Sequence, residues 1–539
     1  MVFGTSVSDF FLLALALFSS SCSAFDFSKG LVSTKLFMLK AEKLPFESNC
    51  VEIMTPPSVS ALLSKVYSAT PRNVISASVT GGGITALQWM FTAPGASSSL
   101  MDSYIPYSRG SLTDMKNKAS FAASLADKSV TQENAIQMAI ISRRRAVEML
   151  LKDTNDLSQC TGINVLGLSC TAKLRGKTSA LGSHRFYVAI ANKIGVMLYH
   201  ATFEKDLRTR EQEDMLCSHV MMKALSLSSN VSLIDNSEGN GKINSSFSQM
   251  PDIKNKNGFK ENEHIHEESI SYGFRDGGDA LDNLYTGQSD QILFFLKKDN
   301  DSHSAEKAVD ENGTSLEEFD FYEDINLPAG SLVYPGSFNP IHEGHIKLVQ
   351  TALDFYKDDR PIVFEIAAIN ADKSALPREL LLSRVKKLLS SLELKNSGIK
   401  NVGVSVTRKP LFVQKAELFK GCTFIIGSDT MLRLLNPKYY ANSNEIDDKE
   451  DKNMQSLLAM VAALSSMYER GNKFIVGGRK DITTNDFVCC DSIIQSEVCR
   501  DLPTNIKDMF HGLNQTQFRV DLSSSQLREK LEKDEEDYN

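Results

Sequence analysis

The sequence has few of the features that mark metal-binding, nucleic-acid-binding or membrane proteins. Its nine cysteines form no Cys-x-x-Cys pair and no cluster with histidine, which argues against a zinc site or a disulfide framework. The net charge of −8 provides no basic excess for a nucleic-acid-binding surface. The apolar run at 10–18 is about half of the ~20 residues that a membrane-spanning helix needs. We therefore expect no nucleic acid, no protein-held metal and no stable membrane insertion.

The composition is that of a globular protein with more than one domain. Hydrophobic residues make up 42% and charged residues 23% of the 539 positions, which is enough to bury ordinary cores. A chain of this length is typical of two or three domains. Shifts in composition predict a targeting segment at 1–24, a transit segment at 25–54, an α/β domain at 55–228, a polar disordered linker at 229–328 and a second α/β domain at 329–539.

The first residues resemble a signal sequence. The apolar run at 10–18 precedes small residues that end at Ala24 and suit a signal peptidase, although no Lys or Arg precedes the run. The Ser- and Lys-containing stretch that follows resembles the bipartite presequence of algae with complex plastids. These features predict secretory entry or a complex plastid; the alternative is a cytoplasmic protein with a disordered start.

The most informative stretch is Tyr334–His345, which reads Tyr-Pro-Gly-Ser-Phe-Asn-Pro-Ile-His-Glu-Gly-His. An apolar strand is predicted directly before it. After it, Ile346, Val349 and Leu353 recur at helical spacing and predict an amphipathic helix. A strand, a glycine-containing turn and a helix open a nucleotide-binding βαβ unit, and the helix N-terminus favours a polyphosphate.

The rest of the second domain repeats this alternation of strand and helix. Such alternation predicts an α/β fold with a Rossmann-like doubly wound parallel sheet, preceded by a smaller layered α/β domain. Ligands of these sheets bind beyond the carboxyl ends of the strands. We predict strands at 362–368, 402–407, 423–427 and 473–477 and helices at 378–393, 429–436 and 453–470.

The motif from Gly336 through His342-Glu-Gly-His345 resembles the signature of the HxGH nucleotidylyltransferases. Gly-Ser-Phe-Asn-Pro is most similar to the nicotinamide mononucleotide adenylyltransferase branch. The resemblance implies transfer of a nucleoside monophosphate from a triphosphate to an acceptor, with release of pyrophosphate. It implies that His342 and His345 contact the phosphates. It also implies that the backbone N–H groups of Gly336, Ser337 and Phe338 assist them and that Gly344 leaves room for close approach.

Two later motifs also resemble this superfamily. Gly427-Ser-Asp429 resembles the Gly-x-Asp motif that binds the adenosine ribose, although Asp429 could serve only as a helix N-cap. The stretch before Arg528 resembles Ile-Ser-Ser-Thr-x-Ile-Arg, in which the arginine holds two phosphate oxygens. The alternative is ordinary serine capping with a solvated arginine. The phosphate-binding serines implied are Ser523, Ser524 and Ser525.

The acceptor segment is predicted after the strand at 362–368. The resemblance makes Asn370, Asp372 and Lys373 candidates for binding the acceptor nucleotide, and an Asx turn is the alternative. Mg²⁺ is expected to arrive with ATP, held mainly by phosphate oxygens and water, so no residue is assigned as its ligand. The expected partners are therefore small molecules, ATP and a mononucleotide; the oligomeric state is left open.

The first domain resembles the C-terminal domain of the CinA family, which includes nicotinamide mononucleotide deamidases. Ser78, in Ser-Val-Thr-Gly-Gly, and Tyr107 carry the resemblance, but Leu112 stands near where the family has a catalytic lysine. A serine without a nearby base is a poor nucleophile, so Lys173 or Arg109 would have to replace that lysine. We therefore favour a ligand-binding or interaction domain over a deamidase.

These patterns together predict transfer of AMP from ATP to a nicotinamide or nicotinate mononucleotide. The first alternative is a cytidylyltransferase or another HxGH enzyme with a different acceptor. The pattern Arg-Thr-x-Gly-Ile-Ser-Thr-Thr of the cytidylyltransferase branch is missing from the sequence. The further alternatives are a non-catalytic nucleotide-binding regulator and deamidase activity in the first domain.

Overall fold

The computed structural model describes residues 57–118, 129–177, 182–205, 207–229, 270–297, 316–369, 375–440, 449–480 and 487–519. All of them belong to Thr55–Asn539, which forms one compact unit. The predicted targeting and transit segments at 1–24 and 25–54 lie outside the described residues. In the described part of the chain, no helix has both the length and the apolar character required to cross a bilayer.

The first sheet is mixed and has the strand order β2-β1-β3-β4-β5-β6. The pairs β1–β2 and β1–β3 are parallel, whereas β3–β4, β4–β5 and β5–β6 are antiparallel. The strands are β1 (Arg72–Thr80), β2 (Leu100–Tyr104), β3 (Ile163–Lys173), β4 (His184–Ala191), β5 (Gly195–Phe203) and β6 (Ser271–Asp276).

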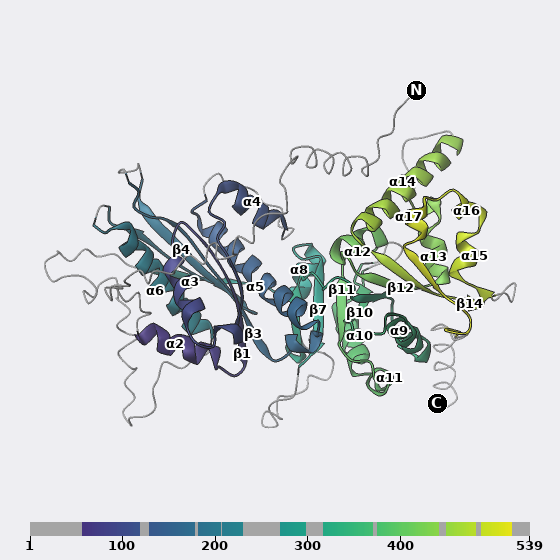
Figure 1. Cartoon of the computed structure of the whole chain (residues 1–539), viewed down its shortest axis with the longest axis horizontal. Helices are drawn as coiled ribbons and strands as arrows, with labels where there is room; N and C mark the ends of the chain where they lie inside the picture. Colours follow the sequence, from purple (N-terminus) through teal and green to yellow (C-terminus); the bar gives the residue numbers. More distant parts are fainter. Residues whose placement is uncertain are drawn as a thin grey trace, which may run out of the picture. The chain divides into compact units, whose positions relative to one another are not determined.

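Helices cover both faces of this sheet, in agreement with the predicted layered α/β fold (Figure 1). On one face, α5 (Gln132–Thr154) packs so closely that a Cβ at Gly167 would lie 2.0 Å from the carbonyl oxygen of Ala139. The N-cap of α5 is Thr131, whose side chain accepts from a backbone N–H, as N-cap residues do. The other face carries α2 (Pro57–Tyr67), α3 (Ile84–Thr92) and α6 (Arg210–Ser228); α4 (Arg109–Lys118) follows β2.

The second sheet has the order β16-β13-β12-β9-β10-β11-β7-β8. From β16 to β11 all neighbouring pairs are parallel, and β7 and β8 extend the sheet as antiparallel strands. This order reverses between β9 and β12, which is the topological switch point of a doubly wound sheet. The parallel strands are β9 (Leu332–Pro335), β10 (Ile362–Ala367), β11 (Val402–Thr407), β12 (Thr423–Gly427), β13 (Lys473–Gly477) and β16 (Phe510–Leu513).

Buried side chains alternate between the two faces of the second sheet. In β10, for example, Val363 belongs to one hydrophobic cluster and Phe364 to another, as the period of two in a strand requires. Helices on both faces complete these clusters and produce the predicted doubly wound architecture (Figure 1). The helices are α9 (Glu343–Tyr356), α10 (Arg378–Ser390), α11 (Leu392–Asn396), α12 (Phe412–Leu418), α13 (Ser428–Leu434), α14 (Lys449–Glu469), α15 (Cys490–Ile494), α16 (Glu497–Arg500) and α17 (Thr504–Lys507).

The predicted disordered linker at 229–328 is wrong for residues 270–297 and 316–328. These residues supply β6, α8 (Ala280–Thr286), β7 (Gln291–Leu296) and β8 (Phe319–Glu323). The apolar run of β7 pairs with β11, and the hydroxyl of Tyr322 on β8 donates to the carbonyl oxygen of Cys160 at 2.7 Å. Composition averaged over a long polar stretch hides short strands of this kind. The remainder of the predicted linker lies outside the described residues.

Candidate active site

The signature turn leaves β9 beside the switch point and folds back on itself. The backbone N–H of Gly336 donates to the carbonyl oxygen of Glu365 at 2.9 Å, which ties the turn to β10. Phe338 has a φ of 42°, a left-handed conformation that non-glycine residues rarely adopt. Its ring lies over Gly336, where a Cβ would come within 2.7 Å of a ring atom. The glycine is therefore needed for this close approach, whatever binds nearby.

Aromatic rings hold the second signature histidine in place. The ring of His345 lies with its centroid 5.2 Å from that of Phe338 and 5.8 Å from that of Tyr334, both in edge-to-face geometry. Phe338 also packs against Phe364 of β10 at 5.1 Å. Edge-to-face packing of this kind fixes ring orientation. The turn and the imidazole thus form one packed unit at the start of α9.

The two histidines stack on each other at the N-terminus of α9. Their ring centroids are 3.7 Å apart with an interplanar angle of 29°. His342 is the N-cap residue, and its backbone N–H donates to Nδ1 of His345 at 3.2 Å. Because Nδ1 of His345 accepts a hydrogen bond, the neutral ring carries its proton on Nε2. His345 therefore presents an Nε2–H donor beside a helix N-terminus.

Burial keeps both imidazoles uncharged at neutral pH. Desolvation, aided by the like charge of His342, lowers the pKa of His345 to about 3. Burial also lowers the pKa of His342. A bound polyanion would raise both pKa values, because a nearby negative charge favours the protonated ring. The site as folded is a pair of neutral donors, and its charge increases only when an anion arrives.

The low pKa of His345 predicts a loss of stability in acid. Below pH 6.5 the unfolded chain binds a proton at this residue that the folded chain does not, so the free energy of unfolding falls as the pH falls towards 3. Between pH 6.5 and 5 the expected cost is about 1 to 2 kcal/mol. Urea unfolding of wild type and His345→Gln at several pH values measures it. Equal pH slopes in the two proteins would contradict the buried neutral state.

A cavity of about 480 Å³ lies at the carboxyl ends of β9 and β10, and residues of α12 and α13 form part of its wall. Gly336, Ser337 and Asn339 of the signature turn form part of its wall. Among the described residues, the histidine rings are not part of that wall. The remaining lining residues are Pro335, Glu365, Ile366, Ala367, Ala368, Leu376, Arg384, Pro410, Phe412, Lys415 and Thr430.

The predicted ribose motif lies at the end of β12, and Thr430, which follows it in the chain, is part of the wall of that cavity. Gly427 is the N-cap of α13, so the alternative that Asp429 serves as the N-cap is wrong. Asp429 lies in the first turn and pairs with Arg479 of β14 (Arg479–Lys480). In the described part of the chain, no heavy atom comes within 4 Å of a Cβ placed on Gly427. Open space therefore stands over the glycine.

The remaining predicted site residues fall into two groups. Gly344 is buried in the first turn of α9, next to the histidine pair. The acceptor candidates and the C-terminal phosphate-binding candidates lie outside the described residues and stay predictions: Asn370, Asp372, Lys373, Ser523, Ser524, Ser525 and Arg528.

Sequence reasoning missed the three charged residues of the cavity wall, Glu365, Arg384 and Lys415. Glu365 is fully buried and its carboxylate accepts from Nζ of Lys415 at 2.5 Å. A signal for the first was present, because a glutamate interrupts an otherwise continuous apolar strand. Lys415 lies on the short helix α12, which hydrophobic periodicity did not predict.

The first sheet positions its predicted residues for packing. Ser78 is fully buried; its hydroxyl accepts from that of Ser142 at 2.9 Å and donates to the carbonyl oxygen of Met138 at 3.4 Å. Tyr107, by contrast, is 71% exposed. In the described part of the chain, the partners of this hydroxyl are Ser142 and Met138, and neither is the base that a serine nucleophile needs. The geometry favours a structural role for Ser78.

The glycine turn at 81–83 leads into α3, whose first backbone N–H groups are already satisfied. The carboxylate of Asp214 accepts from the backbone N–H groups of Gly83, Ile84 and Thr85 at 2.7 to 3.1 Å. A side chain of α6 thus occupies the position at the N-terminus of α3 where an anion would bind.

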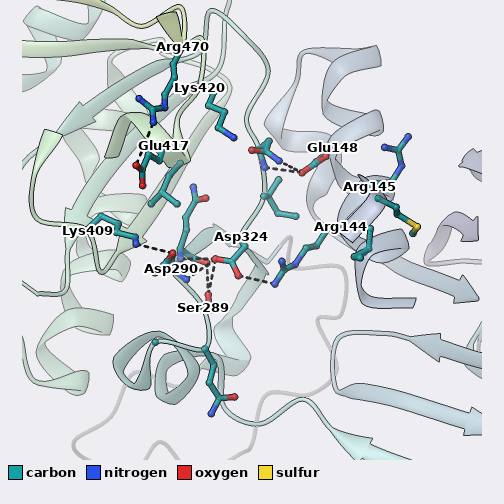
Figure 2. Close-up of a pocket in the computed structure, with 18 of the residues that line it drawn as sticks. Arg144, Arg145, Glu148, Ser289, Asp290, Asp324, Lys409, Glu417, Lys420 and Arg470 are labelled. Atoms are coloured by element: carbon teal, nitrogen blue, oxygen red, sulfur yellow. Dashed lines mark hydrogen bonds and ion pairs between the residues drawn. The ribbon is translucent and has the colours of Figure 1, made fainter. Parts of the chain in front are cut away.

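A second, larger cavity of about 680 Å³ is lined by α5, the loop before β7 and the region of α12 (Figure 2). Its charged side chains pair with one another: Arg144 lies 2.8 Å from Asp324, Lys409 lies 3.1 Å from Asp290, and Arg470 lies 3.6 Å from Glu417. None of the signature residues lines it. The candidate active site is therefore the signature turn with its smaller cavity.

Comparison with protein families decides the class of this site. The sequence profile of the cytidylyltransferase-like family matches residues 333–530, which include β9, the turn, the histidine pair and all strands up to β16. Residues 333–530 form a cytidylyltransferase-like domain. The match supports nucleotidyl transfer as the reaction of this domain, in line with the HxGH resemblance of its signature. No curated protein matches the chain.

Solved structures similar to the chain are CinA proteins, and they cover the part before the cytidylyltransferase-like domain. The competence/damage-inducible protein of Agrobacterium tumefaciens is 14% identical, with 32% of this chain and 98% of that chain covered and a TM-score of 0.25. The CinA-superfamily protein of Escherichia coli is 13% identical, with 32% of this chain and 87% of that chain covered and a TM-score of 0.23. That of Klebsiella pneumoniae is 9% identical, with 32% of this chain and 95% of that chain covered and the same TM-score. Likenesses of this size carry no inference about activity.

Proposed function

We propose that the cytidylyltransferase-like domain transfers AMP from ATP to a nicotinamide or nicotinate mononucleotide and releases pyrophosphate. The observation that carries this proposal is the stacked pair of neutral histidines at the N-terminus of α9, directly after the switch-point strand β9. The Gly-Ser-Phe-Asn-Pro turn, with its resemblance to the nicotinamide mononucleotide adenylyltransferases, supports the choice of substrates.

Positioning and charge neutralisation suffice for this reaction. An oxygen of the acceptor displaces pyrophosphate at the α-phosphorus, and the protein forms no covalent bond. The Nε2–H of His345 and the positive end of α9 would stabilise the charge that develops on the phosphate oxygens. Because His345 is neutral before binding, an approaching phosphate would raise its pKa and increase its positive charge where it is needed.

The donor and the acceptor would occupy adjoining spaces at the carboxyl ends of the strands. The adenosine of ATP is placed at the end of β12, where Gly427 leaves open space. We place the acceptor in the cavity at the ends of β9 and β10. Mg²⁺ would enter with ATP, bound to its phosphate oxygens and water. We propose that Ser523, Ser524, Ser525 and Arg528 contact the triphosphate and that Asn370, Asp372 and Lys373 contact the acceptor.

Pyrophosphate release by the full chain tests the proposal. ATP and CTP are each combined with nicotinamide mononucleotide, nicotinate mononucleotide and other phosphorylated acceptors. The proposal expects turnover with ATP and a pyridine mononucleotide. Turnover only with CTP, or only with an acceptor of another class, would assign a different transferase reaction. ATP binding without any turnover would point to a non-catalytic regulator. Release of ammonia from nicotinamide mononucleotide, followed in parallel, detects deamidase activity.

A further inference from the structure

A carboxylate is buried in the middle of the parallel sheet, at the level of the signature turn. Glu365 is fully buried, and in the β9–β10 register it lies opposite Pro335, the last residue before that turn. Its two oxygens accept from the hydroxyl of Thr407 at 2.6 Å and from Nζ of Lys415 at 2.5 Å. Its neighbours on β10 are apolar, and Arg384 is the other charged residue, besides Glu365 and Lys415, on the wall of the adjoining cavity.

Lys415 retains donor capacity that the protein does not use. Its side chain is only 7% exposed, and an ammonium group has three N–H donors. Among the described residues, Glu365 is the acceptor that Nζ reaches, which leaves two donors without a protein acceptor. The residue lines the 480 Å³ cavity together with Gly336 and Ser337. A cation that is nine-tenths buried, with unused donors and on a cavity wall, is suited to bind an anionic oxygen ligand.

A purely structural role explains the pair poorly. Two charges removed from water pay a desolvation penalty that their mutual attraction only about balances, so such a pair adds little net stability. A hydrophobic pair of the same volume would fill the space equally well. The pair makes more sense as the means of holding a positive charge rigidly at the cavity wall.

We propose that Lys415, held in place by Glu365, binds the phosphate of the acceptor nucleotide. This inference rests on the proposed function and adds a residue to it. The cavity lies at the ends of β9 and β10 and extends to Thr430 of α13, so it adjoins the end of β12, where Gly427 leaves open space. A cation on the acceptor side offsets the repulsion between the acceptor phosphate and the triphosphate, and so allows the two anions to approach.

The test compares the full-length wild type with the double variant Glu365→Gln/Lys415→Met. The double change removes both charges and keeps the volumes, whereas Lys415→Met alone would leave a buried carboxylate unpaired and could unfold the domain. Calorimetric titration measures the affinities for nicotinamide mononucleotide, for nicotinamide riboside, which lacks the phosphate, and for ATP. Thermal unfolding verifies that the variant is folded.

Wild type is expected to bind the mononucleotide at least tenfold more tightly than the riboside, since charge-assisted hydrogen bonds are strong. The double variant should lose this preference and bind ATP within about threefold of wild type. A folded variant that keeps the preference for the mononucleotide, or that loses affinity for ATP instead, overturns the proposal. If wild type binds no pyridine mononucleotide, the proposed acceptor is wrong. Inorganic phosphate is then the probe: tighter binding to wild type than to the variant supports the site, and equal binding overturns it.

Discussion

Replacing His345 by alanine is expected to lower kcat/KM for transfer about 100- to 1,000-fold, the usual cost of losing one oriented donor to a developing oxyanion. The side chain is aligned for this task before any ligand binds. Its ring is packed between Phe338, Tyr334 and His342, and its Nδ1 accepts the backbone N–H of His342, which directs the proton to Nε2. Steady-state pyrophosphate release, with ATP and the acceptor varied in turn, measures the loss.

His511 provides a matched control for this substitution. It is a solvent-exposed histidine on β16, at the edge of the same sheet, where its ring packs against Phe355 with centroids 4.1 Å apart. His511→Ala should leave transfer within about twofold of wild type. A His345→Ala protein that is folded and loses less than about tenfold would show that the histidine pair does not act on the phosphates.

The second large effect is expected at two glycines that differ in what surrounds them. At Gly336 a Cβ would come within 2.7 to 3.0 Å of three ring atoms of Phe338, which is itself buried. Gly336→Ala should therefore displace that ring and with it His345, lower the free energy of unfolding by about 1 to 3 kcal/mol and abolish most activity.

At Gly427 the same substitution meets open space, and its φ of −86° suits any residue. Gly427→Ala should preserve or slightly raise stability, because alanine reduces the entropy of the unfolded chain. If ATP lies against this glycine, the added methyl group should raise the KM for ATP roughly tenfold or more. Denaturant unfolding and steady-state kinetics separate the two effects. A Gly427→Ala protein with unchanged ATP kinetics would show that the nucleotide does not bind at the end of β12.

The sequence predicted those parts of the fold that hydrophobic period and local motif determine. The core strands of the second sheet are apolar and four to six residues long, so β10, β11, β12 and β13 were predicted close to their observed positions. The signature motif predicted the β9–turn–α9 unit because its strand, glycine turn and helix are contiguous in the chain. Many short elements without a clear period were missed, among them α4, α12 and β16.

Features that depend on contacts between distant residues could not be predicted. Glu365 and Lys415 are fifty positions apart, and only the packing of α12 against the strand ends brings them together. Likewise, the sequence could not show that α5 would enclose Ser78, which is sixty-four positions from its partner Ser142. Nor could it show that β7 would pair with β11 across more than a hundred residues. Loop closure of this kind leaves no periodic signal.

The central claim is that the donor triphosphate binds at the N-terminus of α9, against the stacked histidines. A crystal structure of the full chain with Mg²⁺ and a non-hydrolysable ATP analogue tests it most directly. We predict a phosphate oxygen about 3 Å from Nε2 of His345. Density for the triphosphate elsewhere, for example in the larger cavity beside Arg144 and Lys420 (Figure 2), would contradict the claim.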